Sequence, residues 1–181
     1  YMGAEAYGLV GFFSMLQSWF ALLDLGLTPT IGRETARYRG GAISALAYRQ
    51  LFRALNLIFA SIALIGGGGL WLCAEEIALR WLKVSELPIS DVILAVQIMT
   101  IIVSLRWMSG LYRGVISGSE RLLWLSAMNA MIATLRFIGV FASMWKFGFT
   151  PVVFFMHQLA VALLEIISLH LKSRTLLPRC N

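Results

Sequence analysis

Two arginines, Arg106 and Arg136, each lie near the middle of an apolar stretch that is long enough to cross a membrane. An arginine at the centre of a transmembrane helix raises the free energy of insertion by roughly 2.5–3.5 kcal/mol, and each Leu, Ile, Phe or Val offsets about 0.3–0.6 kcal/mol. A strongly apolar helix tolerates one such residue, and we expect the residue to have a partner or a substrate. Because guanidinium groups bind phosphate and carboxylate oxygens, the chemistry predicted here is recognition of an anion.

The elements that position these arginines are membrane helices. Of the 181 residues, 59% are hydrophobic and 13% are charged, against about 25% charged residues in ordinary soluble domains. Five apolar segments have about the 20 residues that a transmembrane helix needs; they cover residues 8–31, 53–73, 92–117, 122–145 and 151–171. The segments are continuous and do not alternate as barrel strands do. The sequence therefore predicts an all-α integral membrane protein with five transmembrane helices.

Charge between the predicted helices predicts their orientation. Basic residues are in clear excess after the first, third and fifth helices, whereas the other three flanking segments are poor in excess base, with Lys146 as the single basic residue of the last. Because excess Lys and Arg remain on the cytoplasmic side, this alternation places Tyr1 outside and Asn181 in the cytoplasm. The net charge of +6 is thereby explained by topology, and we predict no nucleic-acid partner.

Six ionisable side chains of interest lie within these segments: Asp24, Arg106, Arg113, Arg136, His157 and Glu165. A rise of 1.5 Å per residue, counted from the inner end of each helix, places both acids about 10–13 Å deep, Arg106 about 18 Å, and Arg136 and His157 about 22 Å. One interpretation is that the charges pair, Asp24 with Arg113 or Arg106, and Glu165 with the basic group that its helix faces. Alternatively, Asp24, Glu165 and His157 take part in ion coupling.

Arg136 fits the pairing interpretation less well, because no acid is predicted at its level. It is expected either to face a cavity and contact substrate, to make structural hydrogen bonds, or to extend its side chain toward the interface. Arg106 and Arg113 are seven residues apart and share a helix face. If that face lines a cavity, the three arginines form a cationic site for phosphate or diphosphate groups. The alternative for Arg113 is that it marks the inner interface.

Other motifs predict structure rather than chemistry. Gly110, Gly114 and Gly118 form a ridge of small residues at helical spacing, which favours close helix packing over ligand binding. The predicted topology separates Cys73 from Cys180 by the bilayer, and no cysteine or second histidine has ligand spacing to either histidine. We predict no disulfide between the two cysteines, no metal, no cofactor and no enzymatic catalysis.

Several segments resemble a known transporter family. Residues Tyr1–Leu9, Leu23–Leu27 and Arg33–Glu34 resemble the start and exit of the second helix of polysaccharide (O-antigen) flippases, which are members of the multidrug/oligosaccharidyl-lipid/polysaccharide exporter superfamily. Tyr112–Arg121 is similar to the turn between their fourth and fifth helices, and Leu135–Val140 is similar to their fifth helix. These segments are spread over most of the chain.

The resemblance implies a twelve-helix transporter of two lobes, with this chain supplying helices two to six of the N-terminal lobe. The chain begins without an initiator methionine, and we expect it to be a piece of a longer protein that contains the C-terminal lobe. Such flippases move undecaprenyl-diphosphate-linked oligosaccharides across the bacterial cytoplasmic membrane by alternating access. Arg106, Arg113 and Arg136 would then contribute to a cationic cavity for this lipid-linked anionic oligosaccharide, with membrane lipids around it.

Other functions remain open from the sequence. A multidrug or cation antiporter and a peptidoglycan-precursor flippase share the architecture, and an antiporter of cations is expected to have acidic cavity groups. A polysaccharide polymerase or ligase usually needs a substantial outer loop, whereas the longest outer connection here covers only residues 74–91. A membrane scaffold without transport is expected to lack deep arginines.

Overall fold

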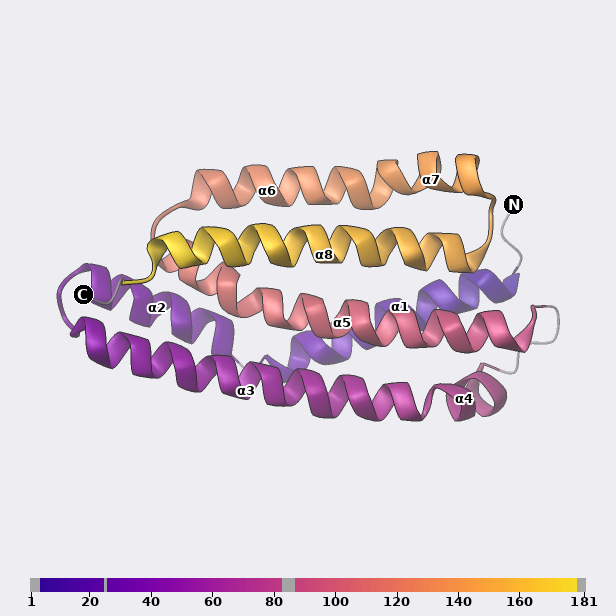
Figure 1. Cartoon of the computed structure of the whole chain (residues 1–181), viewed down its shortest axis with the longest axis horizontal. Helices are drawn as coiled ribbons and strands as arrows, with labels where there is room; N and C mark the ends of the chain where they lie inside the picture. The colour runs from indigo at the N-terminus through magenta and orange to yellow at the C-terminus, as the bar shows by residue number, and fades with distance from the viewer. Residues whose placement is uncertain (1–3, 25, 83–86, 179–181) are drawn as a thin grey trace.

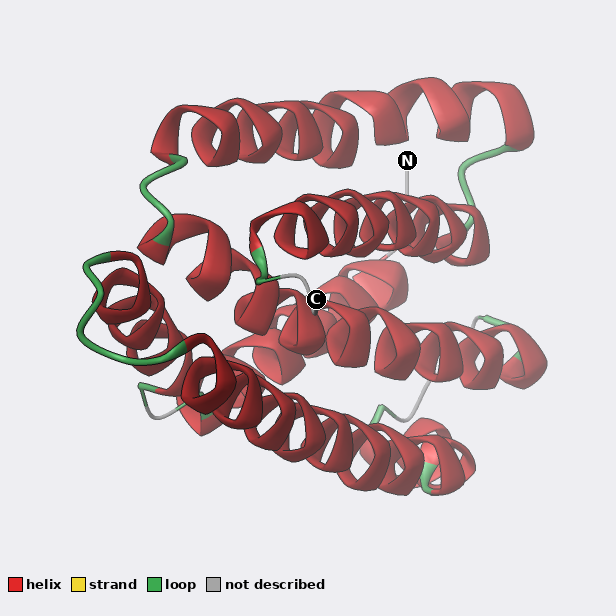
Figure 2. Ribbon diagram, turned by 60° about the vertical axis from the view of Figure 1, so that its left-hand side comes forward, coloured by secondary structure: helices red, strands yellow, loops and turns green. Residues whose placement is uncertain are grey.

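The protein is a bundle of long antiparallel helices in the computed structural model, which describes residues 4–24, 26–82 and 87–178 (Figures 1 and 2). All regular elements in these ranges are helical. The elements are α1 (Ala4–Leu23), α2 (Leu27–Arg39), α3 (Ala45–Leu72), α4 (Ala74–Glu76), the π-helical turn η1 (Ile77–Trp81), α5 (Ile89–Gly118), α6 (Leu122–Thr134), the π-helical turn η2 (Leu135–Gly139), α7 (Val140–Phe147) and α8 (Pro151–Leu176).

Five helices are long and apolar enough to span a membrane, as the sequence predicts. They are Ala4–Leu23, Ala45–Leu72, Ile89–Gly118, Leu122–Phe147 and Pro151–Leu176. Successive spans run in opposite directions along the bundle, so that α5 and α8 end near the beginning of α3 and α6 (Figure 1). The chain is therefore a multi-pass helical membrane protein. Tyr1 and Asn181, whose sides the charge pattern predicts, lie outside the described residues.

The first span differs from its prediction. The segment 8–31 was expected to be one helix, but α1 ends at Leu23 and a separate helix, α2, begins at Leu27. Gly26 adopts a left-handed conformation with φ of 86°, which glycine allows at little steric cost. The Asp24 carboxylate accepts hydrogen bonds from the Thr28 backbone nitrogen at 3.1 Å and from Thr28 Oγ1 at 3.0 Å. Asp24 thus serves the start of α2, as N-terminal capping residues do.

Helix α5 forms the centre of the bundle and packs against α1, α2, α3 and α8. The predicted glycine ridge is a packing surface for α2. A Cβ atom on Gly114 would lie 2.7 Å from the Thr28 carbonyl oxygen, and one on Gly118 would lie 2.7 Å from Thr35 Cβ. Since real Cβ atoms do not approach other heavy atoms this closely, the glycines let α2 approach the α5 backbone.

The α6–η2–α7 span is the least buried of the five. Only 11% of the residues in its apolar stretch are buried, whereas 44% are buried in that of α5. It packs mainly through α7 and η2 against α8. A short connection leads to α8, which starts with Thr150 as N-cap, its side chain accepting a hydrogen bond from the Val153 backbone nitrogen at 3.4 Å, and with Pro151 in the first turn. The α6–η2–α7 span places Arg136, which lies in η2, beside α8.

Candidate functional site

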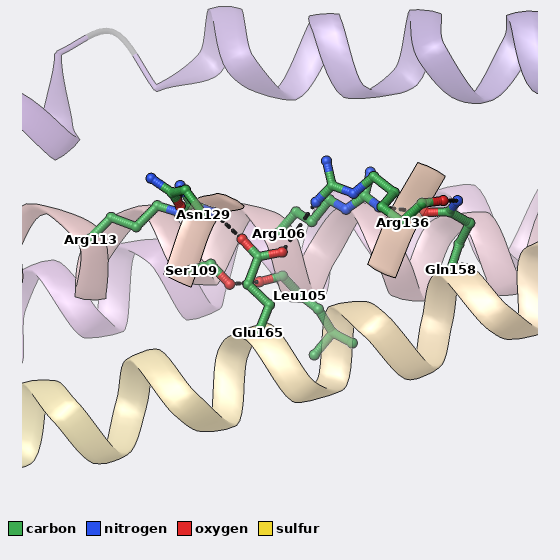
Figure 3. Close-up of polar contacts among 8 residues, drawn as sticks. All are labelled: Leu105, Arg106, Ser109, Arg113, Asn129, Arg136, Gln158 and Glu165. Atoms are coloured by element: carbon green, nitrogen blue, oxygen red, sulfur yellow. Dashed lines mark hydrogen bonds and ion pairs between the residues drawn. The ribbon is translucent and has the colours of Figure 1, made fainter. Parts of the chain in front are cut away.

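Polar side chains from α5, α6, η2 and α8 meet between the helices, around Glu165 (Figure 3). Glu165 is 2% exposed, and its two carboxylate oxygens bind different arginines. Oε1 forms an ion pair with Arg113, and Oε2 accepts from Arg136 Nη2 at 3.2 Å. Arg113 Nη1 also donates to Asn129 Oδ1 at 2.7 Å. One buried acid thus joins three helical spans.

The prediction that Arg136 has no acidic neighbour is wrong, and the direction of helical side chains explains why. Side chains in an α-helix lean toward the N-terminal end of their helix. Because α8 is antiparallel to α6–α7 (Figure 1), Arg136 and Glu165 lean toward each other. Counting backbone rise alone placed them at levels roughly 10 Å apart, whereas the two long side chains close that gap.

Arg106 has a different set of partners. Its Nη2 donates to Gln158 Oε1 at 3.0 Å, and its guanidinium carbon lies 5.3 Å from the centroid of the Phe13 ring. Both partners are uncharged, and no ion pair of Arg106 is found among the described residues. The predicted pairing of Asp24 with Arg106 or Arg113 is wrong, because the described hydrogen bonds of Asp24 go to Thr28.

His157 lies at the level of Arg136, as the sequence predicts. Its Nε2 is 2.9 Å from the Leu135 carbonyl oxygen, and its Nδ1 is 2.8 Å from Ser143 Oγ. The neighbouring Gln158 donates from Nε2 to the Arg136 carbonyl oxygen at 3.2 Å. The described contacts of His157 are therefore with backbone and hydroxyl groups of the adjacent span, not with an acid.

Two cavities meet at the deep arginines. One has a volume of about 320 Å³ and is lined by Asp24, Thr28, Trp107 and other residues of α1, α2 and α5. The other, of about 340 Å³, is lined largely by apolar residues of α1, α7 and α8. Both cavities share the same three polar lining residues, which are Gln17, Arg106 and Arg136. Arg113 lines neither cavity, so the three arginines do not form one continuous cationic surface.

The shared residues carry unused hydrogen-bond donors. Among the described residues, Gln17 Nε2, Arg106 Nε and Arg136 Nε are buried side-chain nitrogens without a partner. Buried polar groups are ordinarily satisfied, and those that are not need an explanation. The guanidinium groups of Arg106 and Arg136 also line both cavities, and two cations beside a cavity form an arrangement suited to an oxyanion. We call these three residues, Gln17, Arg106 and Arg136, the anion site.

Three members of the polar network were missed by sequence reasoning. Gln17, Asn129 and Gln158 are uncharged amides in apolar helices, and attention to charge alone passed over them. A signal was present, because amide side chains within membrane helices commonly form hydrogen bonds between helices. Among the described residues, no group of three or more His, Cys, Asp or Glu side chains is arranged to hold a metal ion.

The fold and the site together define a multi-pass helical membrane protein with a cationic, donor-rich site between its helices. Comparison with known proteins gives no match to a family model, to a curated protein or to a solved structure.

Proposed function

We propose that this chain is part of a transporter that moves a lipid-diphosphate-linked oligosaccharide, such as an O-antigen, capsule or exopolysaccharide repeat unit, across the bacterial cytoplasmic membrane by alternating access. The observation that carries the proposal is the anion site. Arg106 and Arg136 line the same two cavities, and each has a buried Nε without a partner. Arg136 shares the Glu165 carboxylate with Arg113, whereas Arg106 has no ion pair among the described residues. A diphosphate supplies several acceptor oxygens and the counter-charge that Arg106 lacks.

The charge balance of the cavities supports an anion rather than a cation. Within the part of the chain that is described, two arginines line the cavity that contains Asp24, and the same two arginines line the other cavity. The Asp24 carboxylate is engaged by Thr28. An antiporter of cations would present unpaired acids to its cavity, and a diphosphate substrate fits these groups better.

In this proposal the wider architecture follows the family resemblance. The chain would form most of one lobe, and a second lobe would complete the cavity and rock against it during transport. The loop charges would orient the protein with the start of α1 outside and the end of α8 in the cytoplasm. The substrate is an anionic lipid-linked sugar, and the reaction involves no covalent step.

The test uses the full-length protein and a simple prenyl diphosphate as a probe. Arg106→Gln and Arg136→Gln each remove one charge while keeping a polar side chain. We expect each to weaken farnesyl diphosphate binding by about tenfold or more, because a hydrogen bond to a charged group contributes about 1.5–3 kcal/mol. Farnesol, which lacks the diphosphate, should bind weakly to every variant.

Arg121→Gln is the matched control, because Arg121 is exposed at the connection between α5 and α6. It should leave binding unchanged. In cells, the two cavity variants should reduce surface polysaccharide while the amount of protein in the membrane stays normal. Unaltered export and unaltered binding in both cavity variants would overturn the proposed function.

A further inference from the structure

The π-helical turn η2 interrupts the α6–α7 span at the residue that matters most for the anion site. It covers Leu135–Gly139 and includes Arg136. Short π-helical segments inside α-helices are uncommon and occur frequently at functional sites. They disturb the regular bonding of backbone carbonyls to the amide four residues on, so a partner from outside the helix can stabilise them.

Helix α8 supplies such partners to two consecutive carbonyls of the turn. His157 Nε2 lies 2.9 Å from the Leu135 carbonyl oxygen, and Gln158 Nε2 lies 3.2 Å from the Arg136 carbonyl oxygen. Because a carbonyl oxygen can only accept, the histidine must carry its proton on Nε2. Its Nδ1 then faces Ser143 Oγ at 2.8 Å. The imidazole is therefore held between the turn and α7.

The backbone of the turn allows this contact at close range. A Cβ atom built on Gly139 would lie 3.4 Å from His157 Cε1, so the imidazole packs directly against the glycine. Gln158, which is 3% exposed, also accepts from Arg106 Nη2 at 3.0 Å through Oε1. One buried amide thus connects the backbone of Arg136 to the guanidinium of Arg106.

We propose that His157 and Gln158 are positioning residues that clamp η2, so that Arg136 points toward Glu165 and the cavities while Arg106 is held beside it. If the turn relaxed to a regular α-helix, a change of one residue in register would rotate a side chain by about 100°. The inference rests on the proposed function for what the arginines bind. How they are held follows from the contacts themselves.

The first experiment measures where residue 136 points without using transport. In full-length protein in which Cys73, Cys180 and any other cysteine are replaced by serine, Arg136→Cys is labelled with the anionic, water-soluble reagent 2-sulfonatoethyl methanethiosulfonate. His157→Leu removes the donor to Leu135 but keeps the volume, and His157→Gln keeps an amide donor. We expect His157→Leu to change the labelling rate by about tenfold, as loss of a buried hydrogen bond implies.

The same measurement has a built-in control and a clear contrary result. His157→Gln should restore the labelling rate to within about twofold of the parent, because its amide replaces the lost hydrogen bond. All variants must elute as folded protein in detergent. Equal labelling of the parent and His157→Leu would overturn the proposal, as would a failure of His157→Gln to restore the rate.

A double-mutant cycle then separates this inference from the proposed function. If His157 acts through Arg136, His157→Leu weakens farnesyl diphosphate binding in the unaltered protein but not in the Arg136→Gln background. Additive losses would mean a general structural role and would overturn the positioning role. If neither Arg136→Gln nor Arg106→Gln affects binding or export, the proposed function fails, while the labelling rates still decide whether the clamp exists.

Discussion

Arg106 and Arg113 lie seven residues apart on α5 and have the same chemistry, but their surroundings differ. Arg113 meets a buried carboxylate, Glu165, and an amide, Asn129. Arg106 meets the uncharged Gln158 and the ring of Phe13, and its Nε lacks a partner among the described residues. Arg113 is neutralised within the bundle, whereas Arg106 keeps its charge beside two cavities.

The comparison teaches that depth in the membrane does not by itself indicate function. Arg136 is as deep as any arginine in the chain by the rise of its helix, yet it shares the carboxylate of Arg113. What distinguishes the anion site is the combination of cavity lining and unused donors. Substitutions of Glu165, Arg113 and Arg106 test whether pairing to Glu165 and availability to an anion are separate properties.

The largest effect is expected at the shared carboxylate. Glu165→Ala leaves Arg113 and Arg136 without their common counter-charge, and removing one partner of a buried ion pair lowers the free energy of unfolding by about 3–5 kcal/mol. Thermal unfolding in detergent measures this loss. Glu165→Gln, which keeps an acceptor oxygen, should fall between the alanine variant and the unaltered protein. An unchanged melting temperature for Glu165→Ala would show that the triad contributes little.

A smaller effect on stability is expected at Arg113, which Glu165 neutralises. Arg113→Gln removes the ion pair to Glu165 but leaves that acid paired with Arg136, and we expect a loss of about 1–3 kcal/mol in unfolding free energy. Because Arg113 lines neither cavity, the dissociation constant for farnesyl diphosphate should stay within about twofold. A tenfold weakening of binding would extend the anion site to Arg113.

The smallest effect on stability is expected at Arg106, the arginine without a described ion pair. Arg106→Gln loses a hydrogen bond to Gln158 and a contact with Phe13. It also removes the cost of burying a charge that has no counter-ion, so the free energy of unfolding should change by about 1 kcal/mol or less. Thermal unfolding in detergent measures this change. Arg106→Gln should therefore lose much more of its farnesyl diphosphate binding than of its stability. A destabilisation as great as that of Glu165→Ala would show that Arg106 is mainly structural.

The sequence predicted the helical class and all five spans, because long apolar segments with few charges have few alternatives in lipid. It missed the break between α1 and α2, since Asp24 and Gly26 interrupt the helix without interrupting the apolar pattern. It also missed the pairing of Arg136 with Glu165. That contact depends on the lean of two long side chains from antiparallel helices, which a count of residues along one helix does not contain.

The cavities and their polar lining were even less accessible from the sequence. Gln17 comes from α1 and Gln158 from α8, and their approach to the two arginines depends on how the helices pack around α5. The π-helical turn has no local signature in Leu135–Gly139. The backbone of the folded chain shows the turn, and the side chains of His157 and Gln158 lie on two of its carbonyls.

The sharing of Glu165 has a consequence for biosynthesis. Glu165 follows Arg113 by 52 residues and Arg136 by 29 residues in the chain. At a synthesis rate of about 5–20 residues per second, the ribosome adds Glu165 about 1.5–6 s after Arg136. Both arginines are therefore synthesised before the acid that neutralises them. The two ion pairs that join α5 and η2 to α8 can form only after α8 has been synthesised.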